Sequence, residues 1–153
     1  MASAAITLVA LTACSDIRAP KNDNLVNSSS LAPHTEVTFT KWFTTFPSMT
    51  GFTGGDVAGT FAGEVLSVSP FHNGVIVQLQ ARYEVIDPSG SRSFKALIEG
   101  KQNNNTGMAV LNGFITEGWL IGSHVHVTFQ VITPCQFETQ NVCFQGTIRV
   151  LPR

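Results

Sequence analysis

The side chains whose type and spacing could bind a metal are two histidines, His124 and His126, separated by one residue. On an extended strand, residues i and i+2 project to the same face about 7 Å apart, which suits two ligands of one ion. The alternating residues on the strand are apolar and form its apolar face: Val125, Val127 and Phe129. We therefore predict that both histidines face solvent and bind no metal. A metal site remains the weaker alternative because it needs a third donor.

A second chemical feature is Cys14, which ends an apolar N-terminal segment. Residues 2–13 are apolar or small apart from a few hydroxyl side chains, and they finish with Leu11-Thr12-Ala13. This resembles the lipobox of bacterial lipoprotein signal peptides, in which small residues precede the cleavage site and the cysteine sulfur receives a diacylglycerol. The segment is too short to span a membrane. It departs from the lipoprotein pattern because no Lys or Arg lies near its start.

The lipobox resemblance implies an exported cell-envelope protein that is anchored to a membrane through Cys14. The alternative is the start of a buried helix with an incidental cysteine. Residues 15–33 are rich in Ser, Asn, Asp and Pro and show no apolar period, which is typical of a flexible tether. We expect a signal peptide at 1–13, a lipidated tether at 14–34 and a folded domain at 35–153.

The remaining two cysteines are Cys135 and Cys143. In an exported protein an unpaired thiol is a liability, and a bond between them leaves none. The loop that it closes is short, so the chain-entropy model assigns it roughly 2.5 kcal/mol. The spacing does not fit a CxxC zinc or redox motif. We predict a disulfide, with two buried free thiols as the alternative.

From residue 35 onward, apolar residues recur at every second position and no helical period is sustained. Runs of this kind predict strands with one apolar face and one polar face. The clearest are 75–85, 94–99 and 124–131, and further strands are expected near 37–46, 57–68, 108–117 and 142–151. Clusters of turn-forming residues separate them at 51–55, 72–74, 87–90, 103–107 and 118–122.

About seven or eight strands joined by short turns predict an all-β meander. Such a sheet must close on itself or pair with a second sheet, because its edges otherwise stay open. We predict a small closed antiparallel barrel, with a β-sandwich as the alternative. Glycines inside the strand patterns permit bulges or tight bends at barrel corners: Gly59, Gly63, Gly100 and Gly113.

One strand carries a polar stripe of Gln78, Gln80, Arg82 and Glu84. The stripe is expected to face solvent, although a polar lumen is the alternative. Charges of this kind, with Lys95 nearby, would interrupt the lipid-facing band of an outer-membrane barrel. A barrel outside the lipid bilayer is therefore favoured.

Two glycine-containing stretches, 55–61 (GDVAGTF) and 112–118 (NGFITEG), resemble the allene oxide cyclase barrel-like and dirigent-like superfamily in strand rhythm. The resemblance covers 37–150 and implies an eight-stranded barrel with an apolar cavity. Some members of that superfamily steer the cyclisation or coupling of a bound hydrophobic intermediate. No catalytic residue of the family matches a position of this chain, so none is assigned.

A second resemblance involves the histidines again. Gly118, five further residues and His124-x-His126 are similar to the first motif of cupins. That motif continues to a Glu where this chain has Gln130, and the second cupin motif with its further histidine is missing. A cupin-like metal protein is thus the weaker alternative.

Aromatic residues gather near the ends of predicted strands, and most are expected in the core. Trp42 and Trp119 are the candidates for the edge of a ligand mouth, Trp119 because it follows a glycine in a turn. The chain has no G-x-S-x-G elbow and no glycine-rich phosphate loop, so catalytic residues stay unassigned and no cofactor is expected.

The low charge content and the net charge argue against nucleic-acid binding. Charged residues are 12% of the chain and the net charge is -1, so no basic surface is available for phosphates. These features predict an exported lipoprotein with a barrel that serves binding or structure and holds a small hydrophobic ligand. A cyclase-like enzyme is the alternative.

Overall fold

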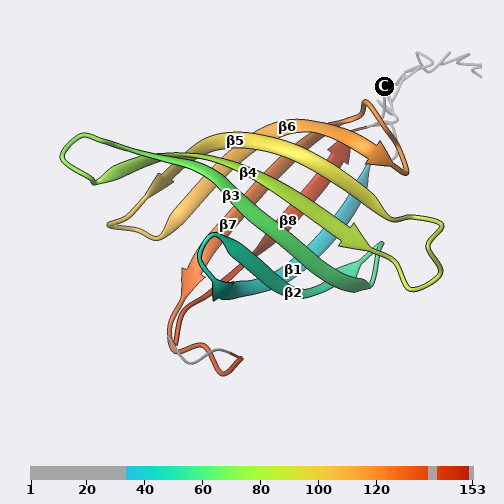
Figure 1. The fold of residues 1–153 in the computed structure, drawn as a ribbon, viewed down its shortest axis with the longest axis horizontal. Coiled ribbons are helices and arrows are strands. Elements are labelled where there is room, and N and C mark those ends of the chain that lie inside the picture. The colour runs from blue at the N-terminus through green and yellow to red at the C-terminus, as the bar shows by residue number, and fades with distance from the viewer. Residues whose placement is uncertain (1–33, 138–140, 152–153) are drawn as a thin grey trace, which may run out of the picture.

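The computed structural model describes residues 34–137 and 141–151, which form a single closed β-barrel (Figure 1). Within these residues there is no helix, and so none that could cross a membrane. The strands are β1 Thr35–Thr45, β2 Ser48–Gly55, β3 Gly59–Phe71, β4 Ile76–Ile86, β5 Phe94–Asn103, β6 Met108–Gly118, β7 His124–Ile132 and β8 Cys143–Leu151.

Each strand pairs antiparallel with the next, and β8 returns to β1. The closing ladder runs from Thr35 opposite Val150 to Lys41 opposite Phe144. Closure leaves the eight described strands with no exposed sheet edge that could pair with another chain. The predicted closed meander is confirmed, and the β-sandwich alternative is not adopted.

One of the predicted turns is wrong. The glycine-rich residues 51–55 lie inside strand β2, and the chain has already turned at Phe46 and Pro47. Gly51 lies where a Cβ would overlap the carbonyl oxygen of Thr40 on β1. Glycine is needed here because two strands approach closely, not because the chain reverses. The other four clusters lie between strands as predicted, except that Asn103 and Gly118 are the last residues of β5 and β6.

The alternation along β4 is confirmed by burial. Ala81, Tyr83 and Val85 are buried inside the barrel, whereas Gln78 and Arg82 are exposed. The polar stripe therefore lies on the outer surface. There Arg82 forms an ion pair of 3.7 Å with Glu64 of β3.

The barrel interior is filled toward the end that carries the β2–β3 turn. Val57 in that turn is fully buried, as are Val37 of β1 and Val85 of β4. The turns β1–β2, β3–β4, β5–β6 and β7–β8 lie at the opposite end, because successive strands alternate in direction. The core therefore closes one end of the barrel and leaves space toward the other.

The loop between β7 and β8 is closed by a disulfide between Cys135 and Cys143, with Cα atoms 5.2 Å apart. Both residues are buried. The backbone N–H of Cys135 donates to the side-chain oxygen of Asn141 at 2.9 Å. The predicted disulfide pair is confirmed, and the bond lies near the end of the barrel that is not filled by the core.

Candidate functional site

A lysine is buried inside the barrel. On β1 the inward positions are Val37, Phe39 and then Lys41, whose exposed fraction is only 2%. Sequence reasoning missed this residue, although a signal was present. Lys41 continues the apolar alternation of Val37 and Phe39 at a position where a strand of this barrel must point inward.

The Lys41 amine contacts a tyrosine from a different part of the sheet. Its Nζ donates a hydrogen bond to the hydroxyl of Tyr83 on β4, and Tyr83 is itself 1% exposed. The Tyr83 ring packs edge-on against Phe61, with centroids 4.9 Å apart. Tyr83 is therefore fixed by the core beneath it and presents its hydroxyl to the amine.

Aromatic rings surround the amine on its other sides. The Nζ atom lies 3.9 Å from the ring centroid of Tyr83 and 4.7 Å from that of Phe129 on β7. The rings of Phe39, Phe61 and Phe144 are more distant, at 5.3, 5.4 and 5.7 Å. These contacts favour the ammonium form by about 0.5–2 kcal/mol for the nearest rings.

Burial acts in the opposite direction and is the stronger effect. Removing the ammonium from water holds the pKa of Lys41 well below its usual value of 10.5. Desolvation of a charge costs several kcal/mol, and no carboxylate lines the space around the amine to offset it. The amine is thus biased toward its neutral form, which has a free electron pair.

Lys41 and Tyr83 lie at the wall of a cavity of about 270 Å³, which we call the interior cavity. Apart from these two residues, its only polar lining side chains are Gln102 and Asn104. The complete lining is Lys41, Phe43, Phe46, Met49, Val65, Val68, Val77, Leu79, Ala81, Tyr83, Gln102, Asn104, Leu111, Phe129 and Phe144.

The cavity has a floor and a mouth. Lys41, Tyr83 and Leu111 are almost fully buried and form its floor. Phe46 in the β1–β2 turn is 65% exposed, and Asn104 in the β5–β6 turn is also exposed. The cavity therefore opens at the end of the barrel that the core leaves unfilled, with the amine at its inner end.

The two predicted mouth tryptophans lie elsewhere. Trp42 projects from the outer surface of β1 and packs against Phe52 and Phe137, at centroid distances of 5.6 and 5.4 Å. Trp119 lies in the β6–β7 turn at the opposite end, packed against the core. Neither lines the interior cavity, so the structure does not bring them together at its mouth.

The two histidines lie on the outer surface of β7. His124 is exposed and its ring lies 4.4 Å from that of Phe114, while His126 shares a hydrogen bond of 2.8 Å with Asn112. In the described part of the chain, no three His, Cys, Asp or Glu residues are grouped to hold a metal ion.

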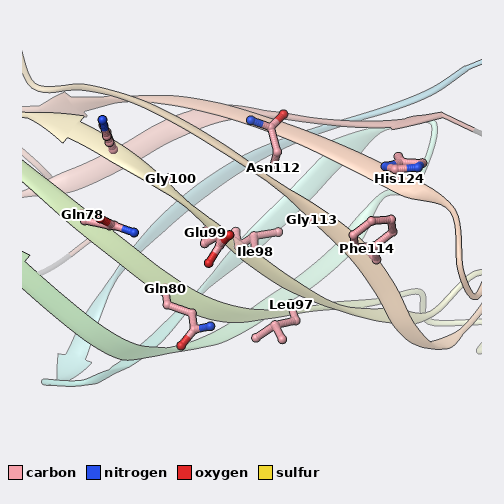
Figure 2. A pocket seen from close by; sticks show the side chains of 11 residues that line it. Gln78, Gln80, Leu97, Ile98, Glu99, Gly100, Asn112, Gly113, Phe114 and His124 are labelled. Carbon is pink, nitrogen blue, oxygen red and sulfur yellow. The ribbon is translucent and has the colours of Figure 1, made fainter.

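A second hollow of about 560 Å³ lies on the outer surface over β4, β5, β6 and β7 (Figure 2). Figure 2 shows Gln78 and Gln80 on one side of it and Asn112, Phe114 and His124 on the other. It is larger than the interior cavity, but its ionisable groups are exposed. We therefore take the interior cavity as the candidate site.

Cys14, the predicted signal peptide at 1–13 and nearly all of the predicted tether lie outside the described residues. Comparisons with protein families, with curated proteins and with solved structures found no match to this chain. The resemblances to bacterial lipoproteins and to the allene oxide cyclase barrel-like superfamily therefore stay predictions.

Proposed function

We propose that this barrel binds a small, mostly apolar ligand in its interior cavity, and that Lys41 and Tyr83 contact the one polar group of that ligand. The observation that carries the proposal is a hydrogen-bonded polar pair at the floor of an otherwise apolar cavity. Ligand sites commonly combine apolar walls with a few convergent polar groups.

The cost of burying Lys41 supports this function over a purely structural one. A buried amine is destabilising, and an apolar residue of similar length would fill the same space without that cost. Proteins often retain destabilising groups where a ligand needs them. The ligand would enter with its polar end first, so that its apolar part lies between Leu79, Val77 and Phe144 toward the mouth.

Binding can be measured with the fluorescent probe N-phenyl-1-naphthylamine. We expect Leu79→Trp to fill the cavity and to weaken probe binding by at least about tenfold, since the added ring occupies the ligand's volume. Gln80→Trp is the matched control, because Gln80 is the next residue on β4 and borders the outer hollow. Its affinity should match the wild type.

Circular dichroism would establish that both variants fold. Val77→Trp, closer to the mouth, replaces Leu79→Trp if that variant does not fold. Equal affinity of the folded cavity variant and its control would contradict binding in the interior cavity.

The protein is further proposed to be an exported lipoprotein anchored through Cys14. The lipobox-like sequence supports this, and a disulfide is typical of oxidising compartments outside the cytosol. In a bacterial host supplied with alkyne-tagged palmitate, wild type and Ser15→Ala should incorporate the tag and sediment with membranes. Cys14→Ser lacks the sulfur that receives the lipid, so it should incorporate none. A tagged Cys14→Ser protein would exclude the anchor at this residue.

A further inference from the structure

The Lys41 amine has a geometry that suits covalent capture as well as contact. It lies at the inner end of the interior cavity, whose walls toward the mouth are mostly apolar. No Asp or Glu lines the cavity, so no ion pair holds the amine in its charged state. The only other ionisable group among the lining residues is Tyr83, whose hydroxyl already contacts Nζ.

We propose that the interior cavity captures apolar aldehydes by forming a Schiff base with Lys41, with Tyr83 transferring the protons. This inference rests on the proposed function, because the aldehyde must first enter the same cavity. It names the ligand class as a carbonyl compound with an apolar chain, a class that a neutral amine selects and an ammonium ion does not.

The chemistry balances without any oxidant or reductant. The Nζ electron pair forms a bond to the carbonyl carbon while the C=O π pair moves to oxygen. The Tyr83 hydroxyl protonates that oxygen and takes a proton from nitrogen, which gives a neutral carbinolamine. The C–O bond then breaks as Tyr83 protonates the departing oxygen, the nitrogen pair forms C=N, and the last N–H proton returns to Tyr83. The products are an imine and one water molecule.

The surroundings of the amine favour each of these steps. Burial lowers the pKa of Lys41, so the nucleophilic neutral form is populated at a pH where surface lysines are protonated. The core contacts of Tyr83 with Phe61 and Phe39 hold the phenol beside Nζ. The apolar walls restrict water, which otherwise hydrolyses an imine.

The test uses nonanal with sodium cyanoborohydride, which reduces an imine to a stable secondary amine. The full-length protein should gain the mass of the aldehyde less one oxygen atom, and peptide mapping should place the adduct on Lys41. At neutral pH the reaction of Lys41 should be at least about tenfold faster than that of Lys101, which is exposed on β5.

Three variants make the result specific. Lys41→Met should lose the fast adduct, and Lys101→Met should keep it. Tyr83→Phe should form the adduct several-fold more slowly than the wild type at saturating nonanal, where a change in ligand affinity no longer affects the rate, and this separates proton transfer from binding.

The two proposals fail in different ways. If N-phenyl-1-naphthylamine binds the cavity but nonanal labels Lys41 no faster than Lys101, the Schiff base is overturned and ligand binding stands. If the probe does not bind and Lys41 is not labelled, both proposals are overturned. Labelling of Lys41 that persists unchanged in Leu79→Trp would place the reaction outside the interior cavity and also overturn the inference.

Discussion

The free energy of unfolding is expected to rise as the pH increases toward 10.5, and Lys41→Met should abolish this rise. The folded pKa of Lys41 lies well below 10.5 because the amine is desolvated. At a pH between the pKa of Lys41 in the folded protein and its pKa in the unfolded chain, the unfolded chain carries a proton on Lys41 that the native protein does not. Stability therefore falls as the pH drops below 10.5, by up to about 1.4 kcal/mol per pH unit.

Urea unfolding followed by circular dichroism across this pH range measures the slope. Lys101→Met is the matched control, since it removes an exposed lysine from the outer surface and should leave the slope unchanged. A wild-type stability that stays flat, or a slope that persists in Lys41→Met, would mean that Lys41 remains protonated in the native barrel.

The same variant separates stability from function. At neutral pH Lys41→Met removes the desolvation cost of the amine, although it leaves the Tyr83 hydroxyl without its partner. We expect a protein that folds at least as stably as the wild type and has lost the polar group at the cavity floor. Functional residues are often destabilising, so that their substitution raises the stability of the protein.

Gly113→Val is expected to destabilise the barrel by about 3 kcal/mol or more. Gly113 of β6 is paired on both sides, opposite Ile98 of β5 and Val125 of β7. A Cβ at this position would overlap the carbonyl oxygen of Leu97 and would lie 2.8 Å from the Cα of Ile98. Because both obstacles are backbone, the strands must separate to accept a side chain.

Asn112→Val is the control for this prediction, because Asn112 is the neighbouring residue and is exposed on the outer surface. A valine there fits a strand well, and the loss of one exposed hydrogen bond to His126 should cost little. Thermal and urea unfolding report both variants. Similar midpoints for Gly113→Val and Asn112→Val would show that β5 and β6 can move apart at no cost.

The displacement of strands by a side chain at position 113 should also alter the interior cavity. Leu111, which forms part of the cavity floor, lies two residues before Gly113 on the same strand. Any Gly113 variant that still folds with displaced strands should therefore bind N-phenyl-1-naphthylamine more weakly.

The period-two pattern of residues such as Ala81, Tyr83 and Val85 was enough to predict strands, their inward faces and the closed meander. These features are local, since alternation decides which face of a strand is buried and short turns force neighbouring strands to pair. The disulfide between Cys135 and Cys143 was also predictable, because the two residues are close in the chain.

Two features depended on contacts between distant segments. The glycines at 51–55 read as a turn because glycine serves both turns and close strand approach, and only the packing of Gly51 against Thr40 distinguishes the two. The candidate site joins Lys41 to Tyr83 across 42 positions and to Phe129 on β7, which is not a hydrogen-bonded neighbour of β1. The alternation determined that Lys41 points inward, whereas only the closed barrel decided that an amine, a phenol and an apolar cavity meet, because strand order and register set which inward side chains share one level.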